Sequence, residues 1–284
     1  MSLLCNLIPH SILLLGAGAA IALSAHADAQ QSPSADGFSE RARESRTEML
    51  RAISEKPADA RPATTYSWKL NIVTTVFVIG DRRGRNTGSA WDPKWQKHYG
   101  GFDDPNSNAR KNYIPTGFTP QLNPFYVALP YNDIMDGRTK PEALTVIPWF
   151  RLSFQKEGKS VCMNRWVAIR RGNRVAYAQW SDCGPFSSTH WQYVFGSERP
   201  KPNANQGAGL NVSPAVRDYL RMQPTDVTDW KFVEFREVPP GPWSQYGENN
   251  DFVIMARRTT HEENRCTLWT HRRPSRGALT PIPL

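Results

Sequence analysis

The sequence lacks the patterns of several common catalytic and binding classes. It has no glycine-rich loop of the kind that cradles phosphate. Its four cysteines and six histidines show no zinc-ligand spacing, and His261-Glu262 has no second histidine to complete a zinc-binding helix. No Lys- or Arg-rich block interleaved with aromatic residues is present, and no internal repeat is visible. We therefore expect neither a cofactor nor a metal, and no nucleic-acid partner.

Basic residues are also missing from the start of the chain. Residues 12–23 form an uncharged run of Ile, Leu, Ala and Gly that has the length of a secretory h-region and is too short to span a bilayer as a helix. Small residues at Ala25, Ala27 and Ala29 offer cleavage sites. We expect residues 1–27 to be a cleavable signal peptide and the protein to be secreted or periplasmic. Because no Lys or Arg precedes the run, an uncleaved N-terminal anchor is the alternative.

Cysteine is scarce, and its count is odd once a leader is removed. Cys5 is then lost, and Cys162, Cys183 and Cys266 remain, so at least one thiol is unpaired or pairs between chains. In an oxidising compartment we expect a disulfide between Cys162 and Cys183, because the two strand-like segments between them can form a hairpin. Three free, buried cysteines are the alternative, and the sequence does not give a partner for Cys266.

Positive charge, proline and tryptophan are abundant instead. The formal net charge is +9, which favours an anionic partner such as an acidic lipid or an acidic cell-wall polymer. The 23 prolines predict long, irregular loops. The ten tryptophans are more than a core needs, and they suggest flat aromatic surfaces for a ligand.

Composition divides the chain after the leader into three parts. Residues 28–65 are polar and charged, with a Pro/Ala-rich end, and we expect a disordered or weakly helical tether. Residues 66–243 carry the strand patterns of a folded domain. Residues 244–284 form a C-terminal extension with a possible edge strand at 252–255 and an arginine-rich tail. We expect the tail to be solvated, and contact with an anionic envelope surface is the sharper alternative.

Short strand patterns dominate the folded domain. In residues 68–78, β-branched and apolar residues alternate with their neighbours, as they do in a half-buried strand. Further strand signals lie at 125–129, 144–154, 165–170, 175–180 and 230–235. Arg171-Gly172-Asn173 is a hairpin turn. Ser213-Pro214 places a hydroxyl N-cap and a proline at the start of one helix. The pattern predicts a mainly β domain, a small barrel with long loops.

One of these loops, residues 85–121, is rich in Asn, Asp, Gly and Pro, and it also carries Trp91, Trp95 and Tyr99. A connection of this length is usually functional or disordered, and its aromatic residues argue against disorder. We expect it to fold over the mouth of the barrel and to bring Trp91 or Trp95 to the same side as Asp182.

The most informative segment lies between Arg174 and Leu220. A strand leads into Asp182-Cys183-Gly184-Pro185-Phe186, and Gly209-Leu210-Asn211-Val212-Ser213-Pro214-Ala215 opens the helix. This order resembles the double-psi β-barrels of expansins and rare lipoprotein A, in which a strand ends in Asp-x-Gly-Pro-Phe and a later Asp-Leu-Ser-x-Ala opens the barrel helix. The resemblance covers roughly Trp68 to Val238. It implies a six-stranded double-psi β-barrel with long loops and one or two short helices, and a polysaccharide ligand, most naturally peptidoglycan.

Asp182 is the acid to which this resemblance draws attention. A carboxyl at a strand end before Gly-Pro sits on a sharp turn, and partial desolvation by Trp180 and Phe186 would raise its pKa. It could then protonate a glycosidic oxygen. The structural alternative is that Asp182 only caps its own turn.

A second acid is harder to find. Where the resembled families have Asp before Leu-Ser, this chain has Asn211, and an amide is neither a general acid nor a general base. Standard glycoside hydrolysis uses two carboxylates, whereas lytic cleavage needs one. Asp81 follows the first strand and is a second catalytic candidate, although a turn residue in a solvated salt bridge is the simpler interpretation. Asp103, Asp104 and Asp133 are further acids without a motif.

We therefore expect an exported protein that binds a wall polysaccharide and possibly cleaves it, with Asp182 as its central acid. The expected substrate-binding residues are Trp91, Trp95, Tyr99, Trp180, Trp191 and Asn211. The alternatives are a non-catalytic carbohydrate-binding or wall-loosening module, which Asn211 favours, and a secreted interaction protein that uses the barrel as a scaffold.

Overall fold

A computed structural model of the chain describes residue 44 and residues 65–80 and 88–270, with side chains up to residue 260. The predicted signal peptide, nearly all of the predicted tether, Asp81 and the end of the tail lie outside the described residues, as does the side chain of Cys266.

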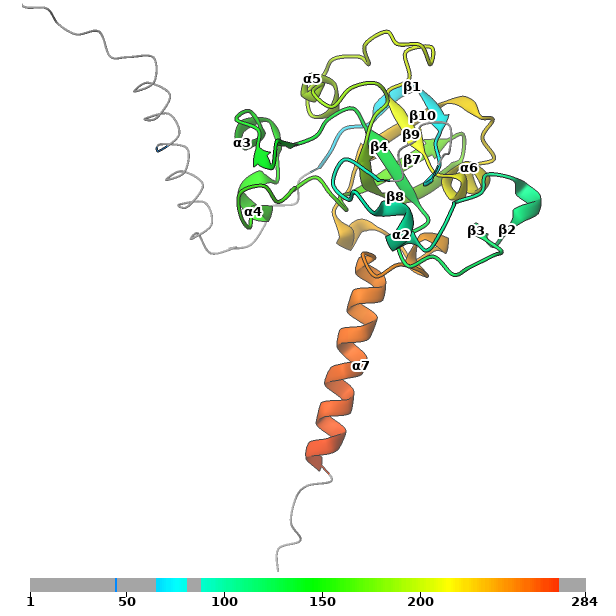
Figure 1. Cartoon of the computed structure of the whole chain (residues 1–284), viewed down its shortest axis with the longest axis vertical. Coiled ribbons are helices and arrows are strands. Elements are labelled where there is room, and N and C mark those ends of the chain that lie inside the picture. Colours follow the sequence, from blue (N-terminus) through cyan, green and yellow to red (C-terminus); the bar gives the residue numbers. More distant parts are fainter. Residues whose placement is uncertain (1–43, 45–64, 81–87, 271–284) are drawn as a thin grey trace, which may run out of the picture. The chain divides into compact units, whose positions relative to one another are not determined.

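Residues 69–232 contain the six strands of a closed barrel (Figure 1). Around the barrel the strands follow the order β1, β10, β7, β8, β4 and β9. Their bounds are β1 Lys69–Val76, β4 Tyr126–Leu129, β7 Trp166–Arg171, β8 Arg174–Cys183, β9 Leu210–Val212 and β10 Thr225–Phe232. The pairs β1–β9 and β4–β8 are parallel, and the other neighbours are antiparallel. The prediction of a mainly β barrel is confirmed.

Two locally predicted elements are also confirmed. Strands β7 and β8 form a hairpin whose turn contains Gly172, which has a positive φ of 56°. Helix α6 (Pro214–Leu220) begins as its sequence indicates, with the Ser213 hydroxyl accepting a hydrogen bond from the amide of Val216. The capping hydroxyl satisfies an amide that has no partner inside the helix.

Helices are more numerous than the sequence predicted. The described part contains six α-helices rather than one or two, and five of them are short. The remaining helices are α2 Trp95–Tyr99, α3 Ala143–Val146, α4 Phe150–Ser153, α5 Trp191–Val194 and α7 Asp251–Thr270, with three 3-10 turns at Ser107–Ala109, Phe235–Glu237 and Pro242–Ser244. Two small hairpins, β2 (Arg110–Lys111) with β3 (Ile114–Pro115) and β5 (Ile134–Met135) with β6 (Arg138–Thr139), lie outside the barrel.

The strand predicted at residues 144–154 is wrong, because this segment forms α3 and α4. Its buried residues Ile147, Trp149 and Phe150 lie in the turn between the two helices and at the start of α4, and they do not alternate with exposed residues as in a half-buried strand. Residues 252–255, predicted as an edge strand, belong to the first turns of α7. The side chain of Asn250, just before α7, accepts a hydrogen bond from the amide of Phe252 in the first turn of the helix.

The barrel interior is filled by one large apolar cluster, which includes Trp180, Trp230 and Leu210. A second, smaller cluster lies where α2 and the end of β1 cover the outside of β4, and it is formed by Ile79, Trp95, Tyr99 and Tyr126. Because side chains alternate along a strand, β4 contributes to both clusters, with Val127 and Leu129 inward and Tyr126 outward. The loop between β1 and β4 is therefore anchored to the barrel wall by its own aromatic residues.

Candidate functional site

Four neighbouring strands bring Asp182 and Asn211 into one row. Ala128 of β4 is paired with Asp182 of β8 on one side and with Asn211 of β9 on the other. Asn211 is paired in turn with Thr75 of β1. The neighbours Leu210 and Val212 belong to the inner cluster, so Asn211 between them faces outward. The row Thr75–Asn211–Ala128–Asp182 thus runs across the outer wall of the barrel.

A bulge in β8 places Asp182 on this outer wall. Val127 pairs with Trp180, but the next residue, Ala128, pairs with Asp182, so Ser181 is the extra residue. Without it, Trp180 and Asp182 would face the same side, because they are two residues apart. With it, Trp180 is fully buried in the core while Asp182 is half-buried at the surface.

The surroundings of Asp182 favour a protonated carboxyl. Burial raises its pKa from the ordinary 3.8 to about 6, and the amides of Ala90 and Cys183, which both donate to Oδ1 at 2.8 Å, lower it in part. Among the described residues no cation pairs with Asp182, and Oδ2 has no hydrogen-bond partner. Since Oδ1 already accepts two bonds, the proton belongs on Oδ2, which is the atom left for a ligand.

Asn211 is held in a fixed orientation beside this carboxyl. The hydroxyl of Thr75 donates to Asn211 Oδ1 at 2.6 Å, so the amide nitrogen points away from Thr75. That nitrogen lies 3.6 Å from the place where a Cβ on Gly184 would stand. Gly184 has a positive φ of 156° and leaves this space open. Asn211 therefore offers an N–H donor on the same wall as Asp182.

An exposed aromatic ring follows Asp182 in the chain. Phe186 is 64% exposed, the largest exposed fraction of any large apolar side chain in the described residues. Its φ of 56° is unusual for a residue with a side chain. The sequence showed Phe186 only as a neighbour that desolvates Asp182, whereas the structure presents it as a free ring face.

The long loop between β1 and β4 reaches the site directly. The amide of Ala90 is one of the two donors to Asp182, and the next residue, Trp91, packs edge-on against Trp180 with ring centroids 5.6 Å apart. The indole N–H of Trp91 donates to Asn132 Oδ1 at 2.7 Å. Trp91 therefore lies on the same side as Asp182 and is half-buried. Asp81, the other predicted catalytic acid, lies outside the described residues.

The predicted aromatic platform needs correction. Trp95 and Tyr99 are buried in the smaller cluster, and Trp180 is buried in the barrel core, so none of the three can present a ring face to a ligand in this structure. Trp191 is half-buried at the start of α5 and packs against the main core. Trp180 contacts only the backbone of Asp182, because its indole N–H donates to the Asp182 carbonyl at 2.8 Å. Of the predicted rings, Trp91 is the half-buried one that follows the Ala90 donor to Asp182.

The predicted disulfide is absent, and both cysteines are free thiols. Cys162 is not on a hairpin strand but in the loop before β7, where its side chain is fully buried. Cys183 ends β8 and donates its S–H to the carbonyl of Tyr131 at 3.1 Å. Burial raises the pKa of both thiols well above the usual value, so the neutral form is favoured.

The other acids suggested by the sequence have structural partners. Asp103 is fully buried, pairs with Arg110 and accepts a hydrogen bond from the Tyr126 hydroxyl at 2.7 Å. Asp133 is also buried, and it accepts bonds from the Ser160 hydroxyl and the Val161 amide. Burial raises the pKa of both carboxyls.

Asp104 caps a turn at the amide of Asn106. Among the described residues, Asp182 is thus the acid in the row Thr75–Asn211–Ala128–Asp182, and it is half-buried and has no side-chain partner.

A pocket of about 370 Å³ opens next to Ser181, the bulge residue, although Asp182 does not line it. His98 and Asp92 lie on its wall as a pair, with His98 Nδ1 2.7 Å from Asp92 Oδ2. Gln121, Asn164, Glu248 and Asn249 also line it, and the Asn249 amide donates to Asn164 Oδ1 at 3.0 Å. Amides and a His–Asp pair suit the hydroxyl groups of a polar ligand.

In the part of the chain that the structure describes, no group of His, Cys, Asp and Glu side chains is arranged to hold a metal ion. Nor does any helix within that part combine the length and apolar character needed to cross a bilayer. No protein-family model matches the chain, and no curated protein matches its sequence.

Proposed function

We propose that this protein binds a cell-envelope polysaccharide, with peptidoglycan as the favoured substrate, and cleaves it lytically with Asp182 as the only acid–base group. The observation that carries the proposal is the half-buried Asp182 carboxyl, whose pKa is about 6 and whose Oδ2 is free among the described residues. A general acid works best when its pKa lies near the working pH.

One carboxyl is sufficient for this reaction. Protonated Asp182 donates its proton to the glycosidic oxygen as the bond from that oxygen to the anomeric carbon breaks. A hydroxyl of the same sugar attacks the anomeric carbon, and the carboxylate of Asp182 takes the proton of that hydroxyl. The products are a chain with a free hydroxyl end and a sugar with an internal anhydro bond. No water is consumed, and Asp182 ends the cycle protonated.

The neighbours of Asp182 fit sugar recognition. The Asn211 amide, which Thr75 fixes, offers a donor to a sugar oxygen, and the exposed ring of Phe186 offers a stacking face. The pocket with His98, Asp92 and the three amides supplies further polar contacts beside Ser181. The pocket also holds two acids, but Asp92 is paired with His98 and Glu248 with Arg257, and Asp182 does not line it. Asp182 is the one acid in the row with Asn211, and lytic cleavage is favoured over two-carboxylate hydrolysis for that reason.

The resemblance to double-psi barrels is part of the proposal. The six strands of the closed barrel support it, and so does the order of a strand, Asp182, and then α6 opened by Ser213. Secretion is likewise part of the proposal. The basic tail is expected to be solvated, and its contact with an anionic envelope surface is the alternative that fits a wall polysaccharide as the ligand.

Cleavage is tested with purified peptidoglycan glycan strands. The wild-type chain should release products with an anhydro end, detectable by mass, and Asp182→Asn should lose this release while it still sediments with the glycan. Asp136→Asn is the matched control, because Asp136 is an exposed turn residue with a positive φ that asparagine tolerates. If Asp182→Asn releases product at the wild-type rate, Asp182 is not the acid and the lytic mechanism is wrong.

A non-catalytic binding module is the second candidate, and Asn211 is the observation that favours it. If the wild-type chain sediments with the glycan but releases nothing, and Asp182→Asn binds equally well, the protein is a binding module. A chain that neither binds nor cleaves any wall glycan would contradict both candidates and leave the scaffold alternative.

A further inference from the structure

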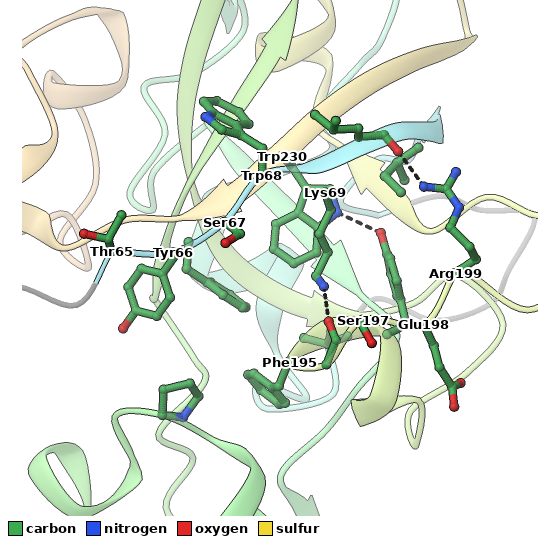
Figure 2. Close-up of a pocket in the computed structure, with 17 residues that line it drawn as sticks. Thr65, Tyr66, Ser67, Trp68, Lys69, Phe195, Ser197, Glu198, Arg199 and Trp230 are labelled. Carbon is green, nitrogen blue, oxygen red and sulfur yellow. Dashed lines mark hydrogen bonds between the residues drawn. The ribbon is translucent and has the colours of Figure 1, made fainter.

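A second pocket lies at the beginning of β1, and it contains neither Asp182 nor Asn211 (Figure 2). Its volume is about 590 Å³, within the usual range for small-molecule sites of roughly 300 to 1,000 Å³. One wall is the segment 65–70, which enters and begins β1, and the opposite wall is 193–199, which includes the end of α5. Trp230 and Phe232 of β10 also adjoin it, and both are buried.

The pocket carries excess positive charge. Lys69 and Arg199 line it, and their charges interact. Among the residues that the structure describes, no carboxylate pairs with either cation. Glu198 is the one acid on the wall, and its carboxylate lies 3.1 Å from His190 Nε2, on the side away from Lys69 in Figure 2.

The two cations have different roles. Both terminal nitrogens of Arg199 donate to backbone carbonyls, those of Leu70 and Asn71, so this side chain ties the 193–199 wall to β1. Lys69 Nζ donates to one carbonyl, that of Gly196, at 2.7 Å. An ammonium group has three N–H donors, so two remain for a ligand. Burial, and next the charge of Arg199, lower the pKa of Lys69, and a bound anion would offset both effects.

The rest of the pocket suits a ring with hydroxyl groups. Phe195 is half-buried, lines the pocket and stacks on Phe232 at an interplanar angle of 17°. Phe232 and Trp230 are themselves buried, so Phe195 is the ring of the three that a ligand can reach. Lys69 Nζ lies 5.4 Å from the ring centre of Tyr193, another ring that lines the pocket, and this contact helps to hold the ammonium in place. The hydroxyls of Ser67 and Ser197 are on exposed residues at the rim.

We propose that this pocket binds a small carboxylated ring compound, a sugar acid, with its carboxylate on Lys69 and its ring against the half-buried Phe195. A single ammonium with two free donors matches one carboxylate oxygen pair, whereas a phosphate would favour the fork of an arginine, and that of Arg199 is already occupied by two carbonyls. The inference needs only this pocket and is independent of cleavage by Asp182.

Calorimetric titration of the full chain with galacturonate, its neutral counterpart galactose, and trigalacturonate tests the proposal. Galacturonate should bind, and galactose should bind at least roughly tenfold more weakly, because it lacks the charged acceptor. Lys69→Met should weaken galacturonate binding by roughly 10- to 100-fold, since a charge-assisted hydrogen bond is lost while the apolar stem remains. Trigalacturonate separates the two sources of a sugar acid: tighter binding than galacturonate indicates a polymer, and equal binding indicates a free sugar.

Two further variants keep the result interpretable. Lys231→Met removes a lysine charge from the neighbouring strand β10. Lys231 Nζ lies 5.3 Å from the Trp68 ring centre, but Lys231 does not line the pocket. It should bind galacturonate as the wild type does. Ser197→Trp changes an exposed rim residue and should block the pocket without unfolding the barrel, as judged by thermal melting.

Several results would overturn the proposal. They are absence of galacturonate binding, equal binding of galactose, tighter binding of inorganic phosphate than of galacturonate, and equal losses in Lys69→Met and Lys231→Met, which would reveal only the general attraction of a basic protein for anions. Asp182→Asn should leave galacturonate binding unchanged, so failure here and failure of the proposed cleavage are distinguishable.

Discussion

Replacing Asp182 by asparagine should stabilise the protein at neutral and alkaline pH. Asparagine keeps the oxygen that accepts the amides of Ala90 and Cys183, and it puts an NH2 group where Oδ2 has no partner among the described residues. What the variant removes is a charge that burial disfavours. The gain is therefore electrostatic, and it depends on whether the wild-type carboxyl is ionised.

The size of the effect follows from the pKa. In the folded chain the pKa of Asp182 is about 6, against an ordinary value of 3.8 that applies when the chain is unfolded. Between these values the folded state holds the proton more tightly than the unfolded state, so the free energy of unfolding of the wild type decreases as the pH rises through this window. A difference of about two pKa units corresponds to about 3 kcal/mol, or about 2 kcal/mol once partial exposure of the carboxyl is taken into account.

Urea unfolding of wild type and Asp182→Asn at a series of pH values measures this difference. The two should be equally stable near pH 3, and the variant should be more stable by about 2 to 3 kcal/mol near pH 8, with most of the change between them. Titration of other groups cancels in the difference, and Asp136→Asn should follow the wild type at every pH. Parallel curves for wild type and Asp182→Asn would refute the raised pKa, and with it the fitness of Asp182 as a general acid.

Two further substitutions test the surroundings of the site. Phe186→Ala should weaken glycan binding by roughly tenfold without changing the melting temperature, because the ring is 64% exposed; unchanged affinity in sedimentation assays would remove Phe186 from the ligand contact. Asp103→Ala should lower the free energy of unfolding by about 3 to 5 kcal/mol in urea titrations, because it removes the buried carboxylate of Arg110 and the acceptor of the Tyr126 hydroxyl, and leaves Arg110 only the partly exposed Asp218. A loss below about 1 kcal/mol would contradict this assignment, and Asp104→Ala, which removes only a turn cap, is the control.

The sequence predicted well what depends on local chemistry. Alternation and β-branching identified β1 and the β7–β8 hairpin, and the hydroxyl and proline at Ser213-Pro214 marked the start of α6. The position of Asp182 at a strand end followed from the Gly-Pro after it. In each case the signal lies within a few neighbouring residues, which is the range over which turn and capping preferences act.

Features that depend on distant residues were missed. The aromatic residues of the long loop correctly indicated that the loop is ordered. The composition of the loop does not reveal which rings are buried, however, and Trp95 and Tyr99 proved to be core residues. The contact of Thr75 with Asn211 depends on the register of two parallel strands that are far apart in the sequence. For residues 144–154 the apolar spacing was assigned the wrong period.

The extra residue in β8 also limits how the chain can vary. Deleting Ser181 would restore even pairing with β4 and force a choice: either Trp180 stays inside the barrel and Asp182 turns inward with it, or Asp182 stays outside and the indole leaves the core. A substitution of Trp180 changes the core alone, and a substitution of Asp182 changes the site alone. A deletion of Ser181 between them would cost either the packing of Trp180 or the exposure of Asp182. In related chains the length of this strand should therefore be invariant where the acid is kept, even if the identity of the bulged residue is free to drift.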